Sequence, residues 1–452
     1  MTSTAAVGDH EPMARSGPPG RADRAGSVRG TVLCLGAWAA LLVVSRLWGL
    51  KVVADAPESI FVDAVPFYGR WDLLISWRWI LAVGVAVVAV VVLPRMVERL
   101  SWWRLLVVVA AAAATWTLAL AFVEPSAIAW RNIYGDYGQF VPFVEQSGPG
   151  GFLRDYVAVQ LELPTHLSAH PPGMMILLWA LAQVGLAGMG VDTALAVIGV
   201  AAAAVAVIVA LRNLAGETRA RAAAPFVVLA PAAVWHTNAD VVFAGFLLVG
   251  FCLFVVATGR HDRRGDLFAS AGGALMGAAV FMTYGVTLFV LPVLVVAVAR
   301  RRVRPVLFGG LAALAVVLLP LTWGFWWLDG LYATNEAYDR NLARVRPYEY
   351  FLVANLAVFA VAVGPAIALA LSRLRDRRTW LLVGAGLGVV ALADLSGLSS
   401  AETERIWQPF MPLVLLAGCA LVPAGQFVRS RPWLAAQAGV ALVLVAALRS
   451  PW

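Results

Sequence analysis

Charged side chains are scarce in this 452-residue chain, since Asp, Glu, Lys and Arg together make up 13% of it. Soluble globular domains carry about 25%. With 61% hydrophobic residues, the chain falls outside the composition of soluble domains and leaves no stretch for a separate soluble domain of useful size. Hydrophobic runs near the ~20 residues that cross a bilayer recur from Gly30 onward. The sequence therefore predicts an integral membrane protein.

Lysine and cysteine are also rare. Lys51 is the only lysine, which excludes a Schiff-base or phosphate-binding lysine elsewhere. Cys34, Cys252 and Cys419 all lie inside hydrophobic runs, so the sequence offers neither a disulfide framework nor a thiolate metal site. The formal charge of +8 comes from arginines in short clusters between hydrophobic runs. Such clusters are typical of cytoplasmic loops and do not form a basic face for nucleic acid.

Four regions are expected along the chain. Residues 1–29 are polar and arginine-rich, which predicts a disordered cytoplasmic tail. Ser45-Arg46-Leu47-Trp48 follows the first hydrophobic run in place of a small-residue cleavage site, so a signal peptide is not expected. Residues 30–104 should hold two transmembrane helices with an outer loop, residues 105–425 a transmembrane core, and residues 426–452 a last transmembrane helix.

The positive-inside rule fixes the expected topology. The apolar stretch Pro171 to Gly190 is about long enough to count as a crossing. A crossing there would carry Arg212, Arg219 and Arg221 to the outer face and invert every later cluster. A helix in the plane of the outer leaflet restores the rule. We expect an all-α bundle of about thirteen crossings with one in-plane helix, a cytoplasmic N-terminus and a plasma-membrane location.

The longest polar interval between hydrophobic runs, Ala129 to Trp179, falls on the outer side. It contains Tyr134-Gly135-Asp136-Tyr137-Gly138, whose glycines allow close backbone approach and whose tyrosines offer stacking surfaces for a sugar ring. A lone loop aspartate is more often solvated surface, but this setting favours a general base at Asp136. In His170-Pro171-Pro172-Gly173 the prolines fit a helix start. His166 and His170 could alternatively bind a metal, which leaves a divalent cation open.

Two further outer segments carry polar groups at the ends of hydrophobic runs. Asn238 and Asp240 stand at a short turn, which suits either a plain turn or a binding site. Tyr284 marks a second expected turn, within a hydrophobic run too long for one helix. Ionisable groups at membrane depth are costly and by default indicate a functional site.

Arginines on the outer side oppose the positive-inside bias and offer a planar fork for phosphate. Arg405 begins a hydrophobic helix, directly after Glu402 and Glu404. The two glutamates could act only as charges that cap the helix N-terminus. The second outer loop holds the other arginines of this kind, Arg340, Arg344 and Arg346.

Asp136, Pro171-Pro172 and Arg212 resemble, in order and spacing, the GT-C superfamily of polytopic glycosyltransferases, in particular protein O-mannosyltransferases and lipid A aminoarabinose transferases. Ala230 to Asp240 resembles the family's next outer turn, and Arg405 to Pro412 its late Arg-aromatic-Pro helix. The resemblance covers about Leu105 to Pro423 of the sequence. The whole sequence also resembles actinobacterial integral membrane proteins that carry the same HPPG and ERIW segments.

Two departures from the family pattern are visible. The family's acidic pair is Asp136-Tyr137 here, and a lysine common near the Tyr284 turn is absent. These departures affect the acceptor site and the donor contacts that the resemblance implies.

The resemblance implies inverting transfer of a sugar from a polyprenyl-phosphate donor to an envelope glycan, lipid or protein acceptor on the outer face. It implies Asp136 as base, and Arg405 and Arg346 as donor-phosphate ligands. It implies substrate contacts from Tyr137, His170, Asn238, Asp240, Tyr284 and Glu404, and it assigns no metal ligand. One alternative is a lipid or solute transporter or flippase, whose paired broken helices the sequence does not show. Another is a non-catalytic envelope-assembly protein.

Overall fold

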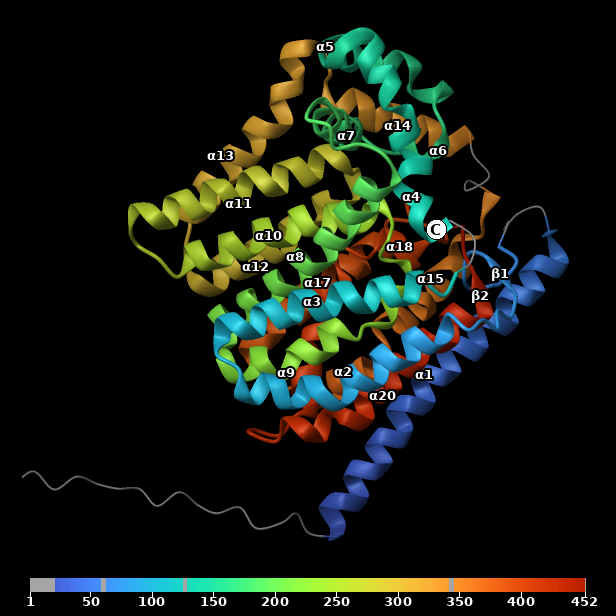
Figure 1. Ribbon diagram of the computed structural model, residues 1–452, viewed down its shortest axis with the longest axis vertical. Coiled ribbons are helices and arrows are strands. Elements are labelled where there is room, and N and C mark those ends of the chain that lie inside the picture. Colours follow the sequence, from blue (N-terminus) through green and yellow to red (C-terminus); the bar gives the residue numbers. More distant parts are fainter. Residues whose placement is uncertain (1–20, 58–61, 125–127, 341–344, 452) are drawn as a thin grey trace, which may run out of the picture.

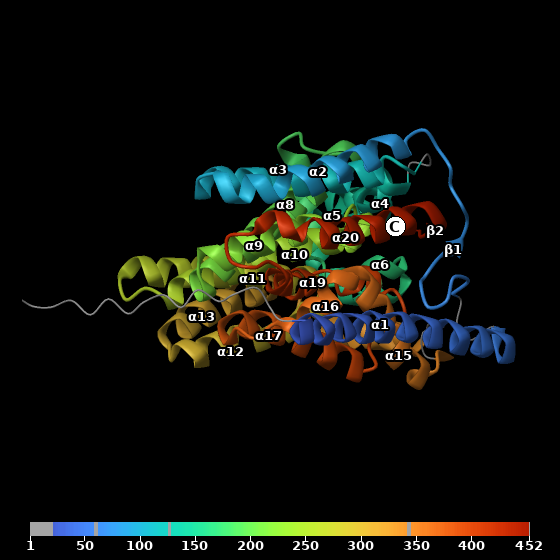
Figure 2. The ribbon, with the colours of Figure 1, turned by 90° about the horizontal axis from the view of Figure 1, so that it is seen from below.

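The protein is almost entirely helical in the computed structural model, which describes residues 21–57, 62–124, 128–340 and 345–451. Within those ranges the one sheet is a two-residue antiparallel pair, formed by β1 (Arg70–Trp71) and β2 (Leu448–Arg449). The long helices lie side by side in one bundle (Figures 1 and 2). A helix satisfies its own backbone hydrogen bonds, which an apolar chain in lipid requires.

Nine helices in the described ranges are long and apolar enough to cross a membrane. They are built on α1 (Arg21–Asp55), α2 (Trp79–Arg99), α3 (Trp102–Ala121), α8 (Met189–Ala215), α10 (Ala239–Thr258), α11 (Arg263–Met282), α13 (Arg304–Leu318), α17 (Arg377–Leu395) and α20 (Arg431–Ala447). A tenth span results if α15 (Tyr348–Val363) and α16 (Pro365–Arg373), which are bent by 92°, count as one. The protein is therefore a multi-pass membrane protein.

Helix length does not support the expected count of about thirteen crossings. Three of the expected crossings consist of short pieces within the described chain: α9 (Glu217–Val228) with η4 (Pro231–Trp235), η5 (Tyr284–Phe289) with α12 (Val290–Arg300), and α19 (Met411–Leu415) with η8 (Leu416–Leu421). A proline explains one of these breaks. Pro231 stands in the first turn of η4, where the missing N–H costs nothing, whereas a proline inside a helix removes a hydrogen bond.

The expected in-plane helix is present as α7 (Gly173–Gln183). Its 11 residues extend only about 16 Å at 1.5 Å per residue, roughly half of a ~30 Å hydrocarbon core. Figure 1 shows α7 nearly end-on, whereas α3, α8 and α10 lie lengthwise in the same view. The helix that opens at Pro171-Pro172 therefore lies across the bundle, as the distribution of arginines predicted.

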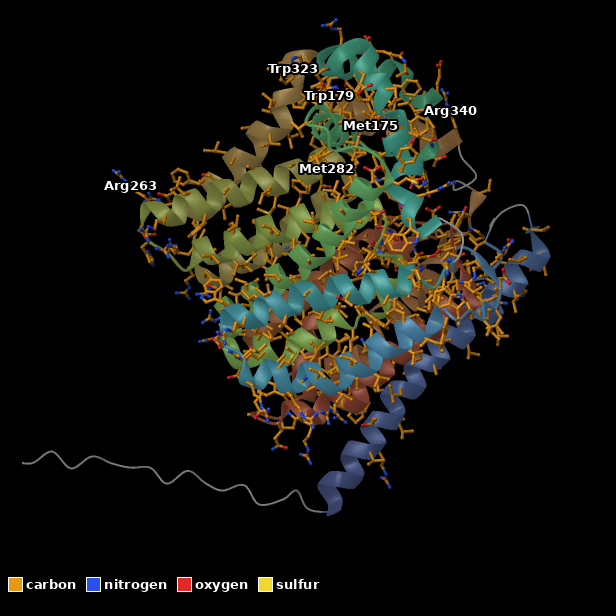
Figure 3. All side chains as sticks on the ribbon, viewed as in Figure 1. Met175, Trp179, Arg263, Met282, Trp323 and Arg340 are labelled. Carbon is orange, nitrogen blue, oxygen red and sulfur yellow. The ribbon has the colours of Figure 1, made fainter. Side chains whose placement is uncertain are left out.

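Short helices cover one end of the bundle (Figure 1). They are α4 (Ile128–Asp136), η2 (Gly138–Phe140), α5 (Val141–Val159), η3 (Gln160–Glu162), α6 (Thr165–Ser168), α7 and α14 (Trp327–Arg340). We call this set the cap. Figure 3 places Arg340 in the cap and Arg263 at the opposite end of the bundle. The remaining short elements are η6 (Leu319–Trp323), α18 (Thr403–Ile406) and η9 (Phe427–Ser430).

Small residues let α8 and α10 approach closely beneath the cap. A Cβ on Gly199 of α8 would lie 2.5 Å from the Val241 carbonyl oxygen, and one on Gly245 of α10 would lie 2.9 Å from the Gly199 Cα. Helices in membranes associate through such contacts because lipid offers no hydrophobic drive between them. The pairing sets the position of the first turn of α10, which carries Asp240.

Candidate functional site

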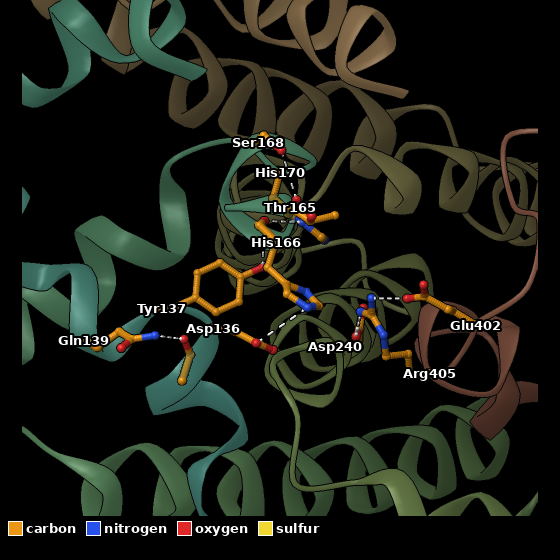
Figure 4. A network of polar contacts seen from close by, with 11 residues as sticks. Asp136, Tyr137, Gln139, Thr165, His166, Ser168, His170, Asp240, Glu402 and Arg405 are labelled. Atoms are coloured by element: carbon orange, nitrogen blue, oxygen red, sulfur yellow. Dashed lines mark hydrogen bonds and ion pairs between the residues drawn. The ribbon is translucent and has the colours of Figure 1, made fainter. Parts of the chain in front are cut away.

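Polar side chains from four separate segments meet where the cap joins the bundle (Figure 4). Asp136 is the last residue of α4, His166 lies in α6, Asp240 in the first turn of α10 and Arg405 in α18. α10 begins here because the Val241 N–H donates to the Asn238 Oδ1 at 3.3 Å, which caps the helix. The fold thus brings together residues that are up to 269 positions apart in the sequence, on the rigid ends of helices.

Asp136 and His166 form the first contact of the site. The His166 Nε2 lies 3.5 Å from the Asp136 Oδ1, and the side chains are 29% and 24% exposed. Burial raises the pKa of Asp136 to about 6; Arg405 opposes this rise, whereas Asp240 and Glu402 add to it. Burial, with Arg405 and His170, lowers the pKa of His166 to about 3. At neutral pH a neutral imidazole therefore faces an ionised carboxylate.

Arg405 forms the second contact. Its Nη1 lies 3.0 Å from the Asp240 Oδ2 and its Nη2 lies 2.5 Å from the Glu402 Oε2. Arg405 and Asp240 are 10% and 7% exposed, whereas Glu402 is 23% exposed. Burial acts to lower the pKa of Arg405, but the two carboxylates outweigh it and raise that pKa. The guanidinium therefore stays charged, and its buried charge is compensated on two sides.

Glu402 does not cap a helix in the way the sequence suggested. It occupies the N-cap position of α18, but its side chain makes no cap hydrogen bond and binds Arg405 instead. Ala401 and Glu402 both have left-handed backbone, with φ of 71° and 62°. Such backbone costs about 1–3 kcal/mol per residue and persists where surrounding contacts hold it. The ion pair with Arg405 is one such contact.

Glu404 binds the backbone of another segment. Its Oε1 accepts a hydrogen bond from the Tyr68 N–H at 3.0 Å, in the segment that leads to β1. Burial raises the pKa of Glu404 to about 8, so this carboxyl is mostly protonated at neutral pH. The structure therefore gives Glu404 a neutral contact with the loop that follows α1.

The segment that carries His166 and His170 is held by hydrogen bonds that are buried or partly buried. The Tyr137 hydroxyl donates to the His166 carbonyl at 3.4 Å, and the His170 Nδ1 lies 2.8 Å from the same oxygen. A carbonyl only accepts, so the His170 Nδ1 carries the proton. The Tyr156 hydroxyl bonds the carbonyls of Leu167 and His170 at 2.7 and 2.9 Å. The backbone beside Asp136 is thus closely fixed.

Other residues singled out from the sequence have contacts of their own. The guanidinium of Arg346 bonds the Ser400 carbonyl and lies over the Tyr68 ring, 6.0 Å from its centroid. Tyr284 is buried against Trp327, with ring centroids 5.0 Å apart. Arg340 pairs with Glu336 on an exposed face of α14. Arg344 lies outside the residues that the structure describes.

A close approach explains one of the two glycines beside Asp136. A Cβ on Gly138 would lie 2.4 Å from the Asp192 Oδ2, on the first turn of α8, whereas a Cβ on Gly135 would meet nothing within 4 Å. Gly138 therefore allows the residues after Asp136 to pack against α8. The two glycines are equivalent in the sequence analysis because the partner of Gly138, Asp192, lies 54 positions further on.

No metal site marks this group in the described part of the chain. No group of three or more His, Cys, Asp or Glu side chains there could hold a metal ion. A cavity of about 30 Å³ lies elsewhere, between α3, α8, η4 and α19. Its lining is mostly apolar, includes Thr117, His236 and Gln408, and includes neither Asp136 nor Arg405.

The arrangement can accept a proton and bind an anion. Asp136 is a carboxylate with a pKa of about 6, close to the working pH that suits a general base. It is partly exposed, so a hydroxyl group can reach it. Arg405 supplies a fixed positive charge whose electrostatic effect extends to Asp136, and Glu402 is the more exposed of its two carboxylate partners.

Neither a protein-family model nor a curated protein matches the sequence. Among solved structures, the chain is similar to the crystal structure of ArnT from Cupriavidus metallidurans in the apo state, with a TM-score of 0.38 and 16% sequence identity. The match covers 60% of this chain and 54% of the ArnT chain, so it spans about half the length of that protein.

Proposed function

We propose that the protein is a membrane glycosyltransferase of the GT-C type. It transfers a sugar from a polyprenyl-phosphate donor to a hydroxyl of an envelope glycan, lipid or protein, with inversion, on the outer face of the plasma membrane. The observation that carries this proposal is the juxtaposition of Asp136, a carboxylate with a pKa of about 6, with the guanidinium of Arg405 in one polar group at the cap. The resemblance of the sequence motifs to the GT-C superfamily is the reason for proposing a sugar as the transferred group and a lipid phosphate as its carrier.

In the proposed reaction, the acceptor hydroxyl attacks the anomeric carbon of the donor. Asp136 accepts the hydroxyl proton as the new glycosidic bond forms. The bond between the anomeric carbon and the phosphate oxygen breaks, and its electron pair stays on the phosphate. One base and a single displacement give inversion at the anomeric carbon.

The leaving phosphate gains negative charge, which a fixed cation stabilises more in the transition state than in the ground state. We assign this role to Arg405. Because its guanidinium binds two carboxylates, the donor phosphate replaces one of them. Glu402 is the more exposed partner, and we propose that it yields its place while Asp240 continues to hold Arg405. Arg346, whose guanidinium lies over the Tyr68 ring, is the second proposed phosphate ligand.

The sidedness follows from the two ends of the bundle. Arg263 lies at the end opposite to the cap (Figure 3), and short arginine-rich connections face the cytoplasm in multi-pass proteins. The cap and its polar group then face outward, where polyprenyl-linked sugars are presented to envelope acceptors. This orientation is the one that the proposed plasma-membrane location requires.

Lipid and glycan analysis of a deletion strain tests the function. We expect one glycan linkage to disappear and its undecorated acceptor to accumulate, and we expect the wild-type gene to restore the linkage. Asp136→Asn, produced at the wild-type level, should not restore it, because an amide cannot accept the proton. Restoration by this variant would remove Asp136 as the base.

A further inference from the structure

We infer that His166 is a positioning residue for Asp136: its imidazole holds the carboxylate in the orientation in which one oxygen faces the acceptor hydroxyl. The inference rests on the proposed function, which makes Asp136 the base. His166 entered the sequence analysis only as a metal ligand, and nothing in its spacing from Asp136 indicates a contact. The structure supplies that contact.

The first observation is the contact itself. The Nε2 of His166 and the Oδ1 of Asp136 are 3.5 Å apart, and the dashed line in Figure 4 joins them. The distance is long for a hydrogen bond, as is common in catalytic pairs before the substrate binds. Only Oδ1 makes this contact, so Oδ2 is the oxygen that can take the proton of a hydroxyl.

The second observation is that the two side chains belong to one closed ring of contacts. Tyr137, the residue after Asp136, donates through its hydroxyl to the His166 carbonyl at 3.4 Å. The side chain of His166 then returns to Asp136. The ring thus links the end of α4 to α6 twice, once through the backbone of His166 and once through its imidazole.

The third observation is that α6 is fixed from outside this ring. The Gln160 Nε2 donates to the Ser168 carbonyl at 2.8 Å, and the Tyr156 hydroxyl donates to the Leu167 carbonyl at 2.7 Å. The Thr334 hydroxyl of α14 also donates to the Ser168 carbonyl, at 3.1 Å. A positioning residue must itself be rigid, and these buried bonds give His166 that support.

The proton stays on Asp136 in this scheme. A neutral imidazole with its proton on Nε2 donates to Oδ1 and keeps that proton throughout the step. Asp136 receives the acceptor proton on its other oxygen and later releases it to water. His166 therefore orients the base and stabilises its ionised form, without becoming charged.

The pH dependence of transfer reports this role. Asp136 acts when ionised, so the wild-type kcat/KM falls as the pH drops through about 6. A donor to the ionised form lowers the pKa of a carboxyl group, so loss of His166 should raise the pKa of Asp136 and move the acid limb to higher pH. The charged and titratable groups around this pair are Arg405 of α18, Asp240 of α10, Glu402 before α18, His170 after α6 and Tyr137 after α4.

The experiment compares wild type, His166→Ala and His166→Gln, all full-length and in lipid nanodiscs, with a polyprenyl-phosphate sugar and its acceptor. We expect His166→Ala to lower kcat about 10–100-fold and to change the donor KM little. We also expect it to move the acid limb of the kcat/KM profile to higher pH. His166→Gln, whose amide can donate to Oδ1, should recover most of the activity and the wild-type limb. The control is His261→Gln, an exposed histidine beside Arg302, which should match wild type.

A second measurement separates this inference from the proposed function. Infrared titration of the carboxyl band, as the difference between wild type and Asp136→Asn, follows Asp136 without any substrate. A higher titration midpoint in His166→Ala supports the positioning role even if no sugar donor is turned over. That combination of results would contradict the proposed transferase function and leave the positioning role standing. An unchanged midpoint together with an unchanged acid limb in His166→Ala overturns the positioning role.

Discussion

The paired state of Arg405 decides what this residue can offer a substrate. Both Nη groups of Arg405 bind a carboxylate, from Asp240 and Glu402, and we propose that a phosphate binds in exchange for one of them. The carboxylates also keep the buried guanidinium in place, since removing one partner of a buried pair leaves an uncompensated charge. The sequence predicted Asp240 and Arg405 as separate candidates, and it could not predict their ion pair because 165 positions separate them.

Substitution of Glu402 tests whether the donor phosphate replaces this carboxylate on Arg405. Glu402→Gln removes the carboxylate that competes with the donor phosphate, so we expect the donor KM to fall about 3–10-fold, equivalent to about 0.7–1.4 kcal/mol. Steady-state kinetics at varied donor concentration measures it. Glu336→Gln, which removes the partner of Arg340 on the exposed face of α14, is the matched control. A higher KM in Glu402→Gln would mean that Glu402 orients Arg405 for the phosphate.

The pKa of Asp136 also has a consequence for stability. Burial raises it to about 6, so the folded protein binds this proton more tightly than the unfolded chain, where the pKa is about 4. The contribution of Asp136 to stability is therefore fully present below about pH 4, and it is lost as the pH rises through about 6. At neutral pH the ionised side chain destabilises the fold.

Asp136→Asn should therefore stabilise the folded protein at neutral pH while it abolishes transfer. We expect a gain of about 1–2 kcal/mol at pH 7.5, after allowance for partial exposure and for the changed contact with His166, and a smaller gain at pH 5. Thermal unfolding in nanodiscs at both pH values measures it. A lower unfolding temperature for Asp136→Asn at pH 7.5 would show that the carboxylate is a structural group.

At the scale of elements, α7 was predictable because two independent signals agree on it. Two prolines precede its first turn, and the arginine clusters after it allow no crossing. The breaks in the later helices were not predictable from hydrophobicity, because an apolar run looks the same whether one helix or two short pieces fill it. The position of α6 depends on tyrosine and glutamine side chains that bind its carbonyls, for which the sequence has no signal.

The packing of η2 on α8 gives a prediction with a matched control. Gly138→Ala would place a Cβ 2.4 Å from the Asp192 Oδ2 and 3.0 Å from the Tyr134 Cδ2, so these side chains must move and the packing of η2 on α8, next to Asp136, is disturbed. We expect transfer to fall at least about 10-fold, since small displacements of a catalytic group are costly, and the unfolding temperature to drop. Gly135→Ala, which meets nothing within 4 Å, should keep activity. Equal activity in both variants would contradict a role for this contact.

At the scale of the whole molecule, composition and the arginine pattern were enough to predict a helical membrane protein, because each depends only on local sequence. Which polar residues share a site depends on helix packing across the bundle. Tyr284 was a site candidate in the sequence, as Asp136 was, yet its ring packs against Trp327. The group at the cap is therefore smaller than the set of candidates, and it gains His166 and Glu402.

The two ends of the bundle give the last prediction. With the native cysteines Cys34, Cys252 and Cys419 replaced by serine, a membrane-impermeant maleimide added to intact cells should label Arg340→Cys in the cap. It should not label Arg263→Cys until the membrane is permeabilised, because the two positions lie at opposite ends (Figure 3). Labelling of Arg263→Cys alone in intact cells would place the polar group of the cap in the cytoplasm, where a base for outer-face transfer would have no substrate.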